Sequence, residues 1–209
     1  MNFDLDIGQW IVIGLSAFLF VWYMLAGAAN RKQGIAIFRW LRTGLSELGE
    51  VSSAEWIGAS NMGARLAVKK AIKPFRRVEA HYLLEPREFL PYWLINRLRG
   101  KRDEVSVRLT LRTAFQGKLE IQRFPPRGVN SLPVVEQIHP DFQVVHLDLE
   151  DARLIAKVKA FLAEYGPGIE KITLRRETPH LEIRAKIKPL LRASAESYFK
   201  AVQTWFQDS

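Results

Sequence analysis

The chain has 209 residues, of which 48% are hydrophobic and 25% charged, a balance typical of a folded protein rather than a disordered one. It has no cysteine, which excludes disulfide bonds, thiolate metal ligands and cysteine nucleophiles. The net charge of +9 is uneven, because residues 31–127 carry 20 Lys and Arg against 9 Asp and Glu, whereas residues 128–209 carry 11 of each. This basic half indicates an anionic neighbour.

Residues 10–29 read WIVIGLSAFLFVWYMLAGAA and contain no charged side chain. Twenty helical residues span about 30 Å, the thickness of the hydrocarbon core of a bilayer. Aromatic residues that favour the membrane–water boundary lie toward both ends of the segment, at Trp10, Trp22 and Tyr23. The segment predicts a transmembrane helix, preceded by a short extracytoplasmic N-terminus at residues 1–9.

The charges on either side of this segment predict its orientation. Asp4 and Asp6 precede it, and Arg31 and Lys32 follow it. The positive-inside rule then places the N-terminus outside the cell membrane and the large C-terminal domain in the cytoplasm. The alternative is a cleaved signal peptide, since AGA at 26–28 resembles a cleavage site. The acidic start and the length of the apolar run argue against it.

Residues 30–49 form a basic amphipathic segment next to the predicted span. Apolar residues recur there at helical spacing, with Arg39, Trp40 and Arg42 among them. Two interpretations remain open: a helix lying on the membrane surface, or a linker helix packed on its own domain. Under the first, the predicted membrane-interface residues are Trp10, Trp22, Tyr23, Arg31, Lys32, Arg39, Trp40 and Arg42.

Residues 50–209 predict one cytoplasmic α+β domain. Two short strands are expected within 50–72. Residues 76–124 and 141–187 then each read as strand, helix, strand, strand, and they share the strings TLR and LEI. This similarity predicts a duplicated unit. A C-terminal helix is expected at about 193–207.

The strands of this domain alternate apolar and polar residues, which is typical of an antiparallel sheet with one solvated face. We therefore expect seven or eight mostly antiparallel strands with helices on one face. Pro86 is placed at the first position of the first unit's helix, and Asp151 and Ser194 are candidate caps of the two later helices.

The helix of the first unit has more apolar side chains than a sheet-covering helix needs. Leu90, Leu94 and Leu98 suffice for that purpose, and a basic run follows them. Surplus aromatic residues bordered by arginine suggest a membrane-dipping edge or a protein docking site. The alternative is that they cover another part of the domain. The candidate docking surface consists of Phe89, Tyr92, Trp93, Arg97, Arg99, Lys101 and Arg102.

The sequence contains no recognisable catalytic motif. His81 and His146 occupy equivalent places in the two units, but a metal site needs at least a third ligand. No nucleotide-binding fingerprint is present. The basic strand faces lack the exposed aromatic side chains on which nucleic-acid bases stack. We therefore predict no catalytic residue, no metal and no cofactor.

These features predict a single-pass membrane-anchored interaction module, a non-catalytic accessory or scaffold subunit of a larger membrane-associated assembly. Its expected partners are the anionic lipid surface and a protein of that assembly. The alternative is a membrane-tethered binder of nucleic acid or another polyanion, which an exposed aromatic residue on the basic strand faces would favour. An enzyme without a recognisable motif is the third possibility.

Overall fold

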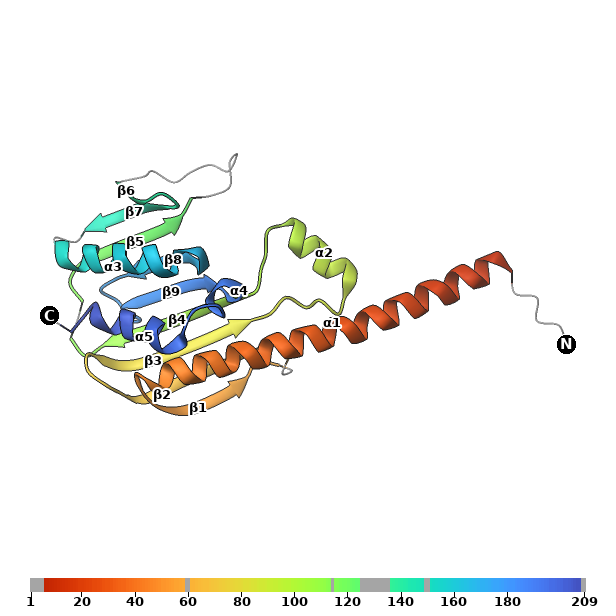
Figure 1. Cartoon of the computed structure of the whole chain (residues 1–209), viewed down its shortest axis with the longest axis horizontal. Coiled ribbons are helices and arrows are strands. Elements are labelled where there is room, and N and C mark those ends of the chain that lie inside the picture. Colours follow the sequence, from red (N-terminus) through yellow and green to blue (C-terminus); the bar gives the residue numbers. More distant parts are fainter. Residues whose placement is uncertain (1–5, 59–60, 114, 125–135, 149–150, 208–209) are drawn as a thin grey trace.

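The computed structural model describes residues 6–58, 61–113, 115–124, 136–148 and 151–207, apart from the side chains at 136, 137 and 146. A long N-terminal helix, α1 (Ile7–Ser46), leads into a domain built on one sheet (Figure 1). The remaining helices are α2 (Leu90–Leu98), α3 (Ala152–Tyr165), α4 (Ile187–Leu190) and α5 (Ala195–Thr204), with a short 3₁₀ turn, η1 (Gly166–Gly168). The chain is therefore α+β, as predicted.

Within the described residues, the sheet has nine strands in the order β1-β2-β3-β4-β9-β8-β5-β7-β6, and each neighbouring pair is antiparallel. This is one strand more than the upper expectation, since β6 is a short additional edge strand. The strands are β1 (Gly49–Trp56), β2 (Gly63–Ala71), β3 (Phe75–Leu83), β4 (Glu104–Leu111), β5 (Lys118–Arg123), β6 (Glu136–His139), β7 (Phe142–Asp148), β8 (Ile169–Leu174) and β9 (Leu181–Lys186).

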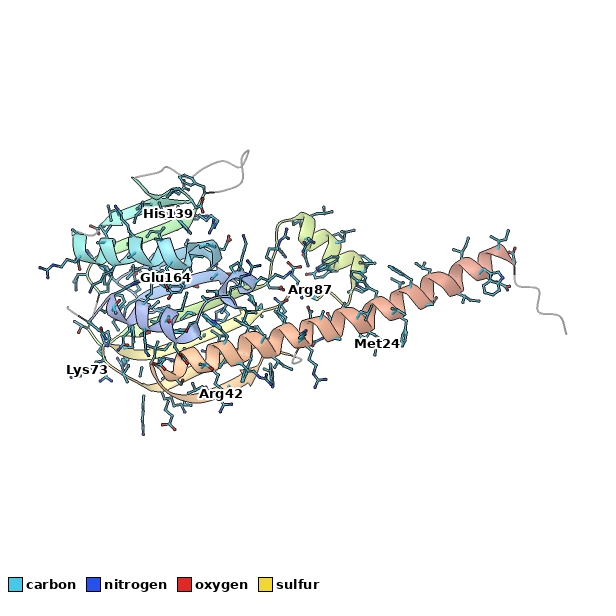
Figure 2. The ribbon with its side chains drawn as sticks, in the orientation of Figure 1. Met24, Arg42, Lys73, Arg87, His139 and Glu164 are labelled. Atoms are coloured by element: carbon cyan, nitrogen blue, oxygen red, sulfur yellow. The ribbon has the colours of Figure 1, made fainter. Side chains whose placement is uncertain are left out.

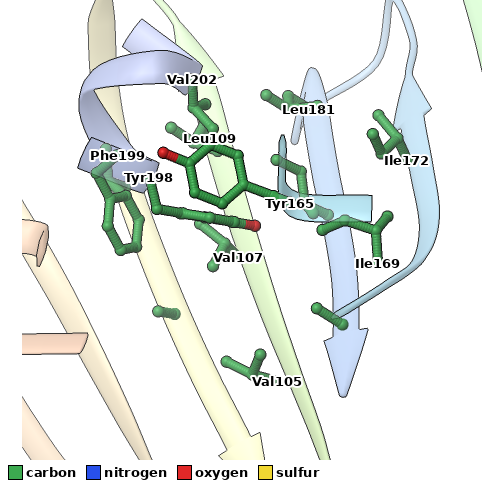
Figure 3. Close-up of a cluster of buried hydrophobic side chains, with 14 of the residues drawn as sticks. Val105, Val107, Leu109, Tyr165, Ile169, Ile172, Leu181, Tyr198, Phe199 and Val202 are labelled. Carbon is green, nitrogen blue, oxygen red and sulfur yellow. The ribbon is translucent and has the colours of Figure 1, made fainter. Parts of the chain in front are cut away.

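One face of the sheet carries the core, and the second half of α1, α3 and α5 lie over it (Figure 1). The apolar side of each strand supplies aliphatic residues such as Val107 and Leu109, and the helices add aromatic rings, including Tyr165, Tyr198 and Phe199 (Figure 3). The apolar stripe of α3, formed by Leu154, Val158, Phe161, Leu162 and Tyr165, is buried in the core. Asp151 and Ser194 cap α3 and α5 as predicted, because each side chain accepts hydrogen bonds from the first turn of its helix.

α1 is one uninterrupted helix of 40 residues with two environments. Its first part is long and apolar enough to cross a membrane, with a mean hydropathy of 2.1 over an 18-residue window that is 6% buried. From Asn30 onward it packs into the domain, where Ile37, Leu41 and Leu45 are fully buried. Of the two interpretations of residues 30–49, the structure therefore has the helix packed on its own domain.

The two predicted units share an order of elements but not an arrangement. Along the chain, both run strand, helix, strand, strand. In the first unit β3 pairs directly with β4, whereas in the second β5 lies between β7 and β8. The duplication is therefore not confirmed. Most of the chain between the two units, residues 125–135, lies outside the described residues.

The helix of the first unit differs most from its prediction. It begins at Leu90 rather than at Pro86, with Pro91 in its first turn. It does not cover the sheet, because Leu94 and Leu98 are exposed and its principal neighbour is α1. Apolar spacing alone could not separate a helix facing a sheet from one facing outward, since both need the same stripe.

Candidate membrane interface

A cluster of polar side chains holds α1 where it enters the domain; we call it the polar clamp, and its members are Asn30, Gln33, Asn61, Glu85, Arg87, Glu88 and Asp103. Arg87 is its centre (Figure 2). Its guanidinium group donates to the side-chain oxygens of Asn30, at 2.7 Å, and Gln33, at 3.0 Å, and it forms an ion pair with Asp103. Both α1 residues are thereby bonded to the segments that flank α2.

Asp103 ties this cluster to the start of β4. Its carboxylate accepts from the Glu85 backbone N–H at 2.8 Å and from the Gln33 amide at 2.7 Å. The Asp103 side chain is 8% exposed and that of Arg87 17% exposed. Buried charges of opposite sign, each with further hydrogen bonds, satisfy one another only in a defined geometry. The clamp therefore fixes the direction in which α1 leaves the domain.

A second contact joins α2 to the apolar part of α1. The Trp22 indole N–H donates to the Arg87 carbonyl oxygen at 2.8 Å, and its ring lies 5.6 Å from that of Trp93. The Arg97 guanidinium lies 5.5 Å from the centre of the Trp93 ring. The first turns of α2 thus lie beside the predicted span.

The predicted membrane-interface residues fall into three groups. Trp10 and Tyr23 are exposed on the apolar half of α1, and the four basic residues Arg31, Lys32, Arg39 and Arg42 are exposed along its second half. Trp22 is half-buried because it faces Arg87 and α2. Trp40 is only 9% exposed, and its indole donates to the Ala193 carbonyl oxygen at 2.8 Å. Trp40 therefore packs in the domain core, and its spacing alone could not distinguish a core tryptophan from an interfacial one.

The candidate docking surface is largely exposed, with one exception. Phe89 is 66% exposed and Tyr92 47%, whereas Trp93 is half-buried against Trp22. Ile95 and Leu98 extend the exposed apolar surface, and Leu98 is 80% exposed. Arg97, Arg99, Lys101 and Arg102 are all exposed beyond it. The structure thus adds Leu98 to the surface, although the sequence predicted that it covers the sheet, and it places Ile95 there as well.

The uncovered face of the sheet is the second charged surface of the domain. A hollow of about 430 Å³ there is lined by residues that include His81, Arg108, Glu182 and Arg184. Burial and the nearby Arg108 guanidinium lower the pKa of His81. Burial opposes ionisation of Glu182, but the guanidinium groups of Arg184 and Arg108 outweigh it and lower the pKa of that carboxyl.

This face does not favour a polyanion ligand. Glu182 pairs with Arg108 at 3.2 Å and Arg184 at 3.1 Å, and Glu79 pairs with Arg65 at 2.9 Å. These carboxylates neutralise much of the positive charge that a phosphate backbone would need. Within the described part of the chain, the strands β2, β3, β4 and β9 carry no large exposed aromatic side chain on this face.

Among the described residues, no group of three or more His, Asp or Glu side chains could hold a metal ion. The side chain of His146, paired in the sequence with His81, lies outside the described part. No family model matches the chain, and no curated protein matches it. We therefore base the proposed function on the geometry of α1, α2 and the polar clamp.

Proposed function

We propose that this protein is a single-pass membrane-anchored interaction module, a non-catalytic accessory or scaffold subunit of a larger membrane-associated assembly. Its N-terminus lies outside the cell membrane, and the domain of residues 50–209 lies in the cytoplasm. The basic residues that follow the apolar half of α1 support this orientation.

The observation that carries this proposal is the continuity of α1. The same helix supplies the apolar span and a buried part of the domain core, with no linker between them. A catalytic domain that only needs to be near a membrane is adequately served by a flexible tether. A helix locked by buried hydrogen bonds instead holds the domain in one orientation, which suits a subunit that presents a surface to a neighbouring protein in the same membrane.

The test is to extract the full chain from its own membranes with a mild detergent, using a tag on the C-terminus. We expect it to elute with a second polypeptide in fixed stoichiometry. A matched variant carries Gly-Ser-Gly-Ser inserted after Ala28, which interrupts α1 between the span and the clamp. It should insert into the membrane and melt near the wild-type temperature but lose the second polypeptide.

Two results would contradict the proposal. One is a chain of 24.0 kDa that elutes alone from native membranes. The other is a second polypeptide that stays bound to the inserted variant with unchanged stoichiometry, because a rigid connection would then be unnecessary for assembly.

A further inference from the structure

We infer that α2 is an in-plane membrane helix, embedded in the lipid interface of the anionic leaflet beside the point where α1 leaves the bilayer. This inference rests on the proposed anchoring and identifies the lipid surface as what covers the exposed side of α2. It would make the protein's membrane attachment two-part, with one helix through the bilayer and one lying in its surface. α2 lies beside α1 outside the sheet (Figure 1).

The depth of α2 follows from its contacts with α1. The apolar segment ends at Ala29, and Trp22 lies seven residues before that end, or about 10 Å along the helix axis. Because Trp22 contacts both Arg87 and Trp93, the first turns of α2 lie at that level. Helices in the membrane plane bury their apolar faces roughly 5–10 Å into the boundary between headgroups and acyl chains. The two depths agree.

The length of the span excludes a position in which α2 stays in water. If the hydrocarbon began only beyond Trp22, the helix available to cross it would run from Ile7 to Val21, about 15 residues or roughly 22 Å. The hydrocarbon core is about 30 Å thick. If the apolar run as far as Ala29 lies in the hydrocarbon, the helix is long enough to cross it. In that position α2 lies in the lipid interface.

The side chains of α2 fit this position. Asn96 is its one buried residue, whereas Tyr92, Ile95 and Leu98 repeat every three positions on an exposed side. Its apolar residues therefore contribute little to the domain core. An exposed apolar helix side is stabilised by a lipid interface and destabilised in water.

The charges around α2 complete the match. Arg97, Arg99, Lys101 and Arg102 follow its apolar side chains, and Arg31 and Lys32 lie just past the end of the span. The Arg102 guanidinium donates to the Arg97 carbonyl oxygen at 3.0 Å and to that of Lys101 at 2.6 Å, which holds the basic run against the end of the helix. Basic side chains at this level favour the negatively charged headgroups of an anionic leaflet.

Three other exposed apolar residues of the domain lie at the end of the sheet that adjoins α2. Ile57 and Met62 flank the tip of the β1–β2 hairpin, and Leu83 ends β3 at the same end of the sheet. Asn61, next to Met62, donates to the Glu88 carboxylate at 2.5 Å, which links this tip to the polar clamp. Ile57, Met62 and Leu83 thus add apolar surface at the same end of the domain as α2.

The experiment uses the absence of cysteine from the chain, because a single introduced cysteine can then be labelled without background. The full chain is reconstituted into vesicles of equal parts phosphatidylcholine and phosphatidylglycerol, with an environment-sensitive fluorophore at one site. Ile95→Cys and Leu98→Cys report on α2. Phe20→Cys reports on the span. Ile72→Cys is the matched control, an exposed isoleucine in the turn at the opposite end of the sheet.

We expect nitroxide groups on the lipid acyl chains to quench the labels at Ile95 and Leu98, with a blue shift of emission that approaches that of Phe20. The Ile72 label should show neither effect. Quenching at Phe20 without quenching at Ile95 or Leu98 would overturn this inference and leave the anchor intact. A label at Phe20 that is not quenched would refute the anchor itself.

A second arm separates lipid from protein as the cover of α2. In inverted native membranes, a membrane-impermeant maleimide should react with Ile72→Cys and be blocked at Ile95→Cys. If Ile95→Cys is blocked there but remains unquenched by lipid nitroxides in the purified reconstitution, a protein covers α2 and the lipid assignment is wrong. Protection that appears only at high protein-to-lipid ratio would likewise overturn it, in favour of a second copy of this chain.

Discussion

Replacing Asp103 with Ala should destabilise the domain more than removing one partner of an exposed ion pair. The change leaves the Arg87 guanidinium buried without its carboxylate, and it removes the acceptor of the Glu85 N–H and of the Gln33 amide. Removing one partner of a buried ion pair costs about 3–5 kcal/mol. Because Arg87 keeps its bonds to Asn30 and Gln33, we take the lower end, about 3 kcal/mol.

For a chain of this length, 1 kcal/mol lowers the melting temperature by about 2–4 °C, so the variant should melt roughly 6–12 °C lower. The six tryptophans provide a fluorescence signal for melting in detergent micelles. Asp141→Ala is the matched control, because Asp141 also pairs with an arginine, Arg123, but its side chain is 60% exposed. An exposed pair is worth about 0–1 kcal/mol, so this control should melt within a few degrees of wild type.

The double variant Arg87→Ala with Asp103→Ala distinguishes the mechanism. If the loss arises from a stranded charge, removing both charges should cost less than the sum of the two single changes. Equal melting temperatures for Asp103→Ala and Asp141→Ala would refute the reasoning, because the polar clamp would then contribute no more than a surface ion pair.

Three further predictions address the core, the open sheet face and the topology. Gly44→Ala should lower the melting temperature, because the added methyl group would overlap the Phe199 ring. Such overpacking costs about 1–3 kcal/mol, whereas the gain in helix propensity is roughly 1 kcal/mol. A higher melting temperature would contradict the close contact of α1 with α5. The folded state holds the pKa of His81 below its unfolded value of about 6.5, so its contribution to stability is complete above that pH and is lost as the pH falls toward the folded pKa. His81→Gln should therefore lose less stability than wild type on acidification from about pH 7 to about pH 5.5, and parallel losses would argue against this site. Protease added to intact cells should leave the domain whole, whereas protease added to inverted vesicles should digest it; the opposite pattern would reverse the proposed orientation.

Regular alternation made the sheet readable from the sequence. Val105, Val107 and Leu109 alternate with polar residues, which a half-buried strand requires, and they are buried in β4 as this pattern predicts. The cap of α3 was readable for a similar reason, since Asp151 precedes an apolar stripe of helical period. In each case the signal lies within one element.

What the sequence could not reveal depends on contacts between distant residues. The shared strings TLR and LEI lie in strands, but strand pairing is set by packing across the sheet, and β5 intervenes between β7 and β8. Arg87 and Asp103 were ordinary charges in the sequence, because only the fold brings them to Asn30 on α1. The sequence identified the candidate docking helix by its surplus aromatic residues, but it did not predict that this helix lies beside Trp22.

The uninterrupted course of α1 also fixes the rotation of its apolar half about the helix axis relative to the sheet. Each residue of an α-helix turns its side chain by about 100° around the axis. Since Trp22 and Asn30 are both bonded to the segment that precedes α2, the intervening residues cannot unwind to absorb a change in length. Deleting one residue between Leu25 and Asn30 would therefore rotate the exposed side chains Phe18, Val21 and Leu25 by about 100° relative to the sheet. In the proposed assembly, the side of α1 available to a neighbouring helix would therefore have a fixed direction relative to the sheet.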